Sequence, residues 1–302
     1  MHIVGGAAAA VLAVSPAVTP LPPAAAGPGS RAGAALEDRT LTQPRLIAIR
    51  AHHHHGVDRV AFIFDGATPT HVRAHYVDRL IADGSGLPIR IAGNDVLQVD
   101  LEPTTWTEPA PVPRREPLAL PDVITVVRSG AFEGVTSFGI GLLSHTAFRV
   151  ITVPARDRVL VDVRTPGRTV MRRVYYFNRE RYLANREPFY VPRLRPVRAL
   201  SPANDALQRL FAGPLARERT HGLRLLRSGA TGFSHLTIRR GVARVRLLGH
   251  CDSHGSTVTV AGEIAATLRQ VPSVRWVKIY DPAGRTASPE GPSDSIPECL
   301  NP

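Results

Sequence analysis

The chain has 302 residues and a formal net charge of +12, and the positive charge is concentrated in its second half. Up to Gly167 the chain contains 15 Lys and Arg against 15 Asp and Glu, whereas from Arg168 onward the counts are 22 and 10. Such a basic segment indicates an acidic wall polymer, an anionic membrane surface or an acidic protein as partner. Beyond the N-terminal region no run of about 18 uninterrupted apolar residues occurs, which argues against a later membrane-spanning helix.

The first 26 residues are predicted to be a signal peptide. They are rich in Ala, Val, Ile and Leu and end in three consecutive alanines, as a secretory apolar segment and its cleavage site do. The alternative is a disordered Ala/Pro tail. We expect residues 27–44 to form a linker and the protein to be exported, either secreted or associated with the cell envelope. Whether the signal is cleaved or retained as an anchor stays open. Export argues against nucleic acid, the usual partner of a strongly basic protein, and so does the lack of interleaved exposed aromatic residues. The protein is expected to be membrane-proximal at most.

Residues 45–166 are predicted to form an all-β sandwich, because short apolar segments alternate with turns. Within one of them Leu97, Val99 and Leu101 are expected to face inward, and Gln98 and Asp100 outward. A Pro-rich loop is expected at 103–121, since proline does not fit a central strand. The predicted strands are 46–49, 57–64, 71–79, 87–91, 96–101, 123–128, 137–143, 147–153 and 158–163.

Residues 167–302 are predicted to form a second, small α+β domain. The strongest signal is a helix at 202–212, with Ser201 and Pro202 at its start and Gly213 and Pro214 at its end. A hairpin is expected around Arg240 and Gly241, a second helix at 257–269, and strands at 173–177, 189–200 and 274–280. The order β-β-α-β-β-α-β favours one sheet with helices covering one face.

Two cysteines, Cys251 and Cys299, are predicted to form a disulfide, as an even number of cysteines in an exported chain suggests. The bond would attach the C-terminal segment to the second domain. A zinc site that uses Cys251 with His250 and His254 is the competing interpretation.

Specific sequence matches relate both parts of the chain to known families. The first part resembles the AMIN-like domain through GVDRV at 56–60, FIF at 62–64, GIGL at 139–142 and FRV at 148–150. The second resembles the GerMN family of spore-germination and sporulation proteins through VYYF at 174–177, NDAL at 204–207 and GVARV at 241–245. The second match departs from the family at Arg246, where an acidic residue is usual.

These resemblances imply a non-catalytic protein of the cell envelope, of the kind that actinobacteria export. Relatives of the first domain are β-sandwiches that bind peptidoglycan. GerMN modules are similar to small α/β units that build rings, which implies self-association or docking at a membrane complex. The expected partner is a wall polymer or an envelope protein, with a homo-oligomer as a further possibility. A regulatory accessory protein of a membrane sensor or transporter is the alternative function, and an envelope hydrolase a second, weaker one.

The candidate binding residues are aromatic or basic. Trp106, in the Pro-rich loop, is a candidate for stacking on a sugar. Arg59 and Arg158 lie on predicted strands with Asp58 and Asp162, where they form either cross-strand salt bridges or a glycan-binding groove. The remaining basic candidates, which belong either to solvated surfaces or to contacts with an anionic partner, are Arg193, Arg195, Arg198, Arg239 and Arg240.

No catalytic or cofactor-binding motif is evident, and we expect neither an enzyme nor a cofactor. There is no G-x-S-x-G nucleophile motif. The run of four histidines at 52–55 is expected in a solvated turn between the first two strands. Because adjacent side chains of an extended chain alternate in direction, only His52 and His54 would share a metal site, and no carboxylate is fixed beside them. We therefore predict adventitious metal binding at most.

Overall fold

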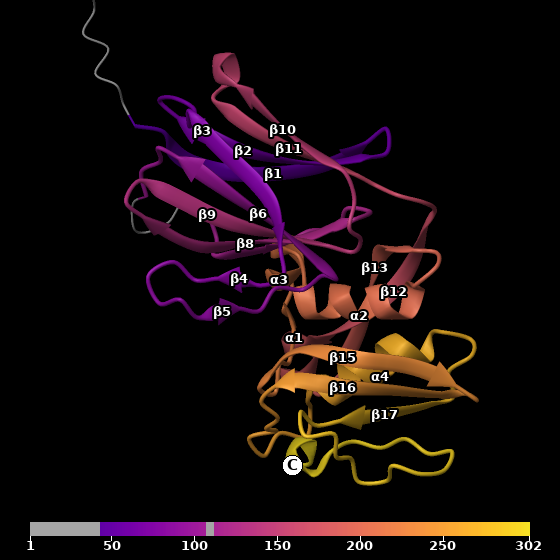
Figure 1. The fold of residues 1–302 in the computed structure, drawn as a ribbon. Coiled ribbons are helices and arrows are strands. Elements are labelled where there is room, and N and C mark those ends of the chain that lie inside the picture. The colour runs from indigo at the N-terminus through magenta and orange to yellow at the C-terminus, as the bar shows by residue number, and fades with distance from the viewer. Residues whose placement is uncertain (1–42, 107–111) are drawn as a thin grey trace, which may run out of the picture. The chain divides into compact units, whose positions relative to one another are not determined.

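The computed structural model describes residues 43–106 and 112–302. The predicted signal peptide and nearly all of the predicted linker therefore lie outside the described residues. All described residues fall in one compact unit that runs from Leu41 to Pro302 (Figure 1). The domain boundary expected at residues 166–167 stays a prediction.

Two antiparallel sheets form the first part of the unit (Figure 1). One has the order β1-β2-β11-β10 and the other the order β3-β6-β9-β8-β7. A small hairpin, β4-β5, and the short helix η1 (Pro154–Arg156) complete this part. The strand bounds are β1 (Arg45–His54), β2 (Val57–Asp65), β3 (His71–Val77), β4 (Leu80–Ile81), β5 (Pro88–Ile89), β6 (Asp95–Glu102), β7 (Arg115–Pro117), β8 (Val123–Phe132), β9 (Val135–Leu142), β10 (Phe148–Val153) and β11 (Arg158–Arg164).

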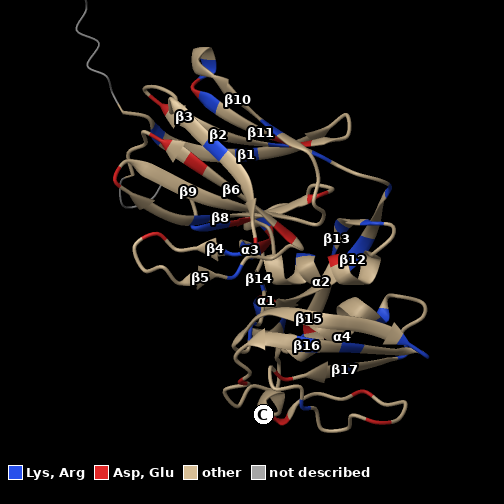
Figure 2. Ribbon diagram, viewed as in Figure 1, with Lys and Arg blue, Asp and Glu red and all other residues tan. Residues whose placement is uncertain are grey.

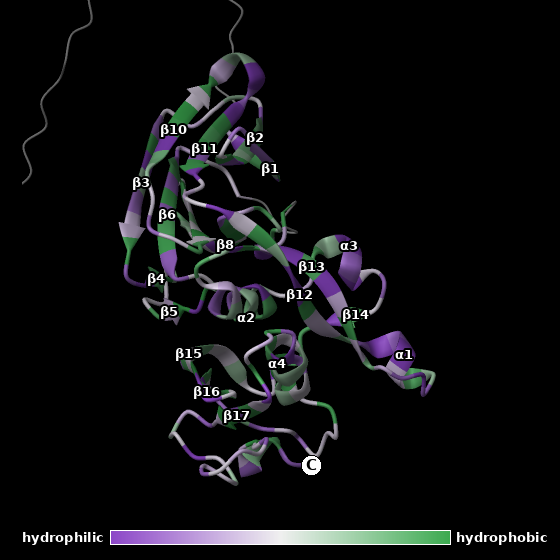
Figure 3. Ribbon diagram, turned by 90° about the vertical axis from the view of Figure 1, so that its right-hand side faces the viewer, coloured by the Kyte–Doolittle hydropathy of each residue, from purple (hydrophilic) through white to green (hydrophobic). Residues whose placement is uncertain are grey.

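The two sheets enclose a common apolar core, which makes this part a β-sandwich. Phe62 from one sheet and Phe138 from the other lie with ring centroids 5.1 Å apart. Leu97, Val99 and Leu101 are fully buried, and the alternation along β6 is visible in Figure 3. The predicted inward and outward positions of this strand are therefore confirmed.

One strand, β7, lies inside the segment that was expected to be a loop, so that expectation is wrong at residues 115–117. Its proline, Pro117, is compatible with a strand because β7 is the last strand of its sheet. A proline at an edge removes no hydrogen bond from the interior of a sheet.

The second part of the unit contains two separate three-stranded sheets, β13-β12-β14 and β15-β16-β17. The helices α2 and α4 pack on each other and contact strands of both sheets (Figure 3). The expectation of one sheet covered on one face is therefore wrong. The bounds are β12 (Thr169–Asn178), α1 (Arg179–Leu183), β13 (Tyr190–Arg198), α2 (Pro202–Ala212), α3 (Ala216–Arg219), β14 (Leu223–Arg224), β15 (Ala230–Arg239), β16 (Val242–Gly249), α4 (Val260–Arg269), β17 (Trp276–Tyr280) and η2 (Glu298–Leu300).

Local sequence signals place α2 and the hairpin between β15 and β16 where they were predicted. Pro202 occupies the start of α2, and Gly213 follows its last residue with a φ of 96°. Arg240 and Gly241, the two residues of the hairpin turn, have φ values of 51° and 80°. A two-residue turn with both φ angles positive matches the right-handed twist of the flanking strands.

Along the edge of β12 that faces α4, β14 pairs only with Phe177 and Asn178, and side chains take the place of a strand over the rest. Backbone N–H groups of every second residue donate to side-chain oxygens of α4 and of Gln270, which directly follows it. The bonds run from Arg173 to Gln270 Oε1 (2.8 Å), from Tyr175 to Thr267 Oγ1 (3.1 Å) and from Phe177 to Glu263 Oε1 (2.9 Å). The opposite edge of β12 pairs with β13, whose outer edge includes Pro192 and Pro196.

The helix α2 also attaches the second part of the unit to the sandwich. The Arg209 guanidinium, buried in this contact, donates to the carbonyl oxygens of Leu118 (2.9 Å), Leu120 and Pro121 (3.2 Å). Gln208 Oε1 accepts from the Gly93 N–H at 2.9 Å. One core cluster therefore continues from α2 into the sandwich.

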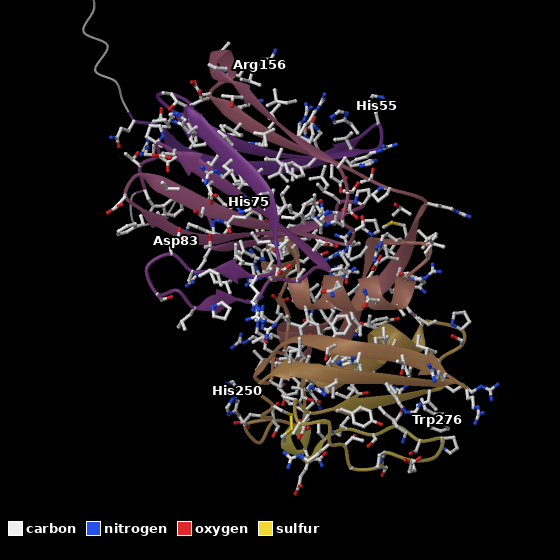
Figure 4. All side chains as sticks on the ribbon, in the orientation of Figure 1. His55, His75, Asp83, Arg156, His250 and Trp276 are labelled. Atoms are coloured by element: carbon white, nitrogen blue, oxygen red, sulfur yellow. A yellow bond between two sulfur atoms is a disulfide. The ribbon has the colours of Figure 1, made fainter. Side chains whose placement is uncertain are left out.

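A disulfide joins Cys251 and Cys299, with Cα atoms 5.6 Å apart, and this confirms the predicted pairing. It is the yellow bond near His250 in Figure 4. Zinc ligation by Cys251 is excluded because its sulfur is bonded to Cys299. Leu300, next to the bridge, is only 2% exposed, so the bond attaches the C-terminal segment at a point where that segment packs into the core.

Candidate functional site: a basic face of the sandwich

The outer face of the sheet β1-β2-β11-β10 carries a group of basic side chains, which we call the basic face. The strands are in register there, so that His52, Arg59, Asp162 and Arg149 form one row across all four strands. Figure 2 shows the Lys and Arg positions on these strands in blue. The basic face comprises Arg50, His52, His54, Arg59, Arg149, Arg158 and Arg164.

Asp162 lies at the centre of the row and is held by two arginines. Arg59 donates to its two oxygens at 2.5 and 2.7 Å, and Arg149 donates to one of them at 3.1 and 3.0 Å. The hydrogen bond from Arg59 is the main cause that lowers the pKa of Asp162, and the same bond raises the pKa of Arg59. Two guanidinium groups on one carboxylate leave a net positive charge at this point.

The histidines at the end of β1 lie beside this ion pair. The His52 and His54 rings stack with centroids 5.4 Å apart, so they share a face as predicted. Burial lowers the pKa of His54, and the neighbouring Arg59 charge lowers it further. The turn is confined to His55 and Gly56, with His52, His53 and His54 inside β1. The expectation that the whole run lies in a turn is therefore wrong.

A shallow hollow of about 310 Å³ opens at the same end of the basic face. It is lined by His55, Val57, Phe148, Arg149 and Arg164, together with Asp162. Guanidinium groups beside apolar surface suit a ligand that has both an anionic group and a carbon skeleton, and the volume lies at the lower end of the range for ligand sites.

The second carboxylate on this face is also paired. Asp65, at the far end of β2, accepts from Arg45 at 2.5 Å. Arg50, Arg158 and Arg164 are exposed. Within the described ranges, none of these three side chains forms an ion pair. Of the two interpretations given for Arg59, the cross-strand salt bridge is correct. Arg158, in contrast, pairs with neither Asp58 nor Asp162.

Trp106, the candidate for sugar stacking, is half-buried and packs against the sandwich core. The guanidinium carbon of Arg128 lies 3.8 Å from its ring centroid, in a cation–π contact. An aromatic ring in this position already has a planar partner on one of its faces.

The three arginines of β13 were expected on a solvated surface or in contact with an anionic partner. Instead, they lie in contacts within the protein. Arg195 is buried and donates to Glu218, and Arg193 lies 3.8 Å from the same carboxylate. Arg198 forms a two-pronged contact with the buried Asp205, at 2.8 Å for each bond. These residues hold β13 to α2 and to the turn that contains α3.

Arg239 and Arg240 differ from the β13 arginines because both are exposed at the tip of the β15–β16 hairpin. They have no ion-pair partner among the described residues, and they lie on the sheet β15-β16-β17, to which β13 does not belong. Figure 4 labels Trp276, on β17 of the same sheet.

Sequence reasoning missed Arg149 and Arg164 as members of the basic face and misjudged the role of Asp58. The alternation along β10 and β11 was the available signal for the two arginines. The fully buried Asp58 carboxylate accepts from the N–H groups of Asp122 (2.6 Å) and Val123 (2.9 Å) and contacts His53 (2.7 Å). It connects the two sheets inside the sandwich and is not part of a surface groove.

Guanidinium and imidazole groups with paired carboxylates hold anions; they do not by themselves form a nucleophile with a base. In residues 43–106 and 112–302, no cluster of three or more His, Cys, Asp or Glu side chains has the arrangement of a metal site. Of the helices in these ranges, none has the length and apolarity needed to cross a membrane.

The sandwich, with the basic face, corresponds to a match with one family model. Residues 44–165 match the AMIN-like domain. The matched segment runs from the start of β1 to just past the end of β11, and so contains every residue of the basic face. The match suggests an envelope-related, non-catalytic module. No curated protein and no solved structure matches the chain.

Proposed function

We propose that this protein is an exported, non-catalytic component of the cell envelope whose AMIN-like sandwich binds an anionic wall polymer through the basic face. The observation that carries the proposal is the concentration of arginine and histidine on one exposed sheet face whose carboxylates, Asp162 and Asp65, are both paired with arginines of the same sheet.

The spacing of the basic face supports a polymer as ligand. Neighbouring strands of a sheet are about 4.8 Å apart, so arginines on adjacent strands present charges at intervals that a chain of repeating anionic groups can follow. The hollow beside Arg149 and Arg164 adds a position where one repeat unit can enter. Phe148 and Val57 there offer apolar surface to the carbon skeleton of the polymer.

Co-sedimentation of the purified protein with purified cell wall tests this proposal. The variant Arg149→Gln/Arg164→Gln removes two charges that line the hollow and keeps the Arg59–Asp162 pair. Two surface charges at about 0.7 kcal/mol each predict binding about tenfold weaker. The matched control is Arg239→Gln/Arg240→Gln, which removes the same charge from an exposed hairpin tip. Equal weakening by both variants would show that net charge, and not the basic face, holds the protein to the wall.

We further propose that residues 167–302 form a GerMN-like α+β module that mediates assembly, with an envelope protein or a second copy of this chain as partner. The order of strands and helices from β12 to β17 and the sequence matches at 174–177, 204–207 and 241–245 support this assignment. Light scattering over a range of protein concentrations tests self-association. A strictly monomeric protein that also captures no envelope protein after cross-linking in cells would contradict it.

A further inference from the structure

A second basic site lies away from the basic face, where the sandwich meets the second part of the unit. A cavity of about 180 Å³ is lined there by four arginines together with Pro117 and Gly213. The arginines come from separate elements: Arg115 from β7, Arg219 from the end of α3, Arg224 from β14, and Arg227 from the loop before β15. The elements α3 and β14 are labelled in Figure 2.

Backbone carbonyl groups, and not carboxylates, orient three of these arginines. Arg115 Nη2 donates to the Arg90 oxygen at 2.6 Å, and Arg219 Nη1 donates to the Pro214 oxygen at 2.9 Å. Arg224 Nη1 donates to the Arg219 and Leu223 oxygens, both at 2.7 Å. Each of these bonds uses one terminal nitrogen and leaves other N–H groups of the same guanidinium for a ligand.

The charge of the four guanidinium groups is not balanced by the carboxyl groups near them. Glu116 approaches Arg219 only to 4.0 Å. The buried Glu263 acts on Arg227 from a distance, and burial raises its own pKa to about 8, which favours its neutral form. Burial lowers the pKa of Arg115 to about 10, and repulsion from Arg227 contributes. Positive charge in such a cavity is unfavourable until an anion enters.

We propose that this cavity is a binding site for a phosphoryl group, as a free phosphate or pyrophosphate or as the phosphate of a lipid headgroup. Guanidinium groups bind phosphate through paired, charge-assisted hydrogen bonds. Arginines that approach from four elements match the oxygens of a tetrahedral anion better than the two oxygens of a planar carboxylate. The volume of about 180 Å³ admits a phosphate or pyrophosphate group.

The position of the site gives the ligand a structural effect. Arg115 belongs to the sandwich, and Arg219, Arg224 and Arg227 belong to the second part of the unit. An anion that contacts arginines from both parts stabilises their contact, and binding to the folded state alone raises the stability of the protein in proportion to the logarithm of ligand concentration.

Calorimetric titration of the purified protein with inorganic pyrophosphate tests the site. We expect saturable binding at one site, weakened about tenfold or more in Arg115→Gln/Arg227→Gln, because each lost bond to a charged group contributes on the order of one decade of affinity. The control Arg239→Gln/Arg240→Gln carries the same charge change outside the cavity and should bind as the unmodified protein does. Arg227→Gln alone, which removes no hydrogen bond to the backbone, covers the case in which the double variant fails to fold.

Two further arms identify the ligand class and its source. Titration with succinate should give much weaker binding, because its carboxylates are planar. Binding to phosphatidylcholine vesicles only when they contain phosphatidic acid, lost in Arg227→Gln, would assign the same cavity to a lipid headgroup. The proposal is overturned by three outcomes: neither pyrophosphate nor phosphatidic acid binds, succinate binds as tightly as pyrophosphate, or the control variant is weakened as much as Arg227→Gln.

Discussion

Replacement of both cysteines by serine, Cys251→Ser/Cys299→Ser, should destabilise the protein by about 4 kcal/mol. The bond links positions 48 residues apart, and the chain-entropy model gives about 4 kcal/mol for a loop of that length at room temperature. The folded state keeps its other contacts near the bridge. The Ser253 N–H donates to the Cys299 oxygen at 2.8 Å, and Leu300 remains buried. The effect should therefore arise mainly in the unfolded state, which regains the freedom that the bond removes.

Urea unfolding followed by tryptophan fluorescence measures this difference. The unmodified protein, the same protein under reducing conditions, and the double serine variant are compared, and the last two should coincide. A control, Ser253→Ala, removes the Ser253 Oγ bond to the Asn301 oxygen (2.5 Å) and the bond that this Oγ accepts from the Gly255 N–H (3.2 Å), but it keeps the disulfide. Because exposed hydrogen bonds contribute about 1 kcal/mol or less each, the control should lose clearly less stability than the double variant. A loss below about 1 kcal/mol in the double variant would refute the reasoning, since it would mean that the C-terminal segment does not unfold together with the rest.

Three further substitutions test buried charges. Arg209→Met leaves the carbonyl oxygens of the 118–121 segment without their donor and should cost about 3 kcal/mol in urea unfolding; a loss under about 1 kcal/mol would show that water replaces the guanidinium. Asp162→Asn should cost about 2 kcal/mol near neutral pH. The pKa of Asp162 is lowered in the folded state, so its ion pairs stabilise the unmodified protein fully above pH 3.8, the ordinary pKa of an aspartate. This stabilisation is lost as the pH falls further. The asparagine variant should not show that loss. Glu263→Gln tests a pH dependence of stability in the opposite direction. Burial raises the pKa of Glu263 from 4.5 to about 8. The contribution of its protonated form to the free energy of unfolding is therefore fully present below pH 4.5 and lost as the pH rises through 8. Thermal unfolding of the glutamine variant across this range should lack that decline.

Local sequence signals predicted individual helices and strands well. They could not predict which strands, far apart in the chain, pair with each other. The start and end of α2 follow from Pro202 and Gly213, because these residues act through their own backbone angles. The division of β12 to β17 into two sheets follows from contacts between α2, α4 and strands far apart in the chain. The helices α1 and α3 were missed because four or five residues are too few to show a helical period.

The candidate site residues show the same limit. The arginines of β13 looked like a basic surface because their carboxylate partners, Glu218 and Asp205, come later in the chain and have no fixed spacing from them. Asp205 lies in the first turn of α2 and holds Arg198. Only part of the basic face could be predicted from the sequence. Arg59 was identified, but the strand order that brings Arg149 beside Asp162 cannot be obtained from local sequence patterns.

The strand edges described above restrict how copies of this protein can associate. Since the N–H groups of residues 173, 175 and 177 point to α4, the alternation of an antiparallel pair directs the N–H side of residues 190, 192, 194 and 196 of β13 outward. Two of these four are proline and carry no N–H, so of these positions only Tyr190 and Leu194 offer an N–H group to an incoming chain. The outer edge of β13 is therefore poorly suited to strand addition, and side chains from the end of α4 occupy most of the opposite edge of β12. In the part of the chain that the structure describes, no strand pairs with the outer edge of β15. If copies of the protein join through their backbones, that edge of β15 is one candidate position for the shared sheet, beside the edge strands β3 and β10 of the sandwich.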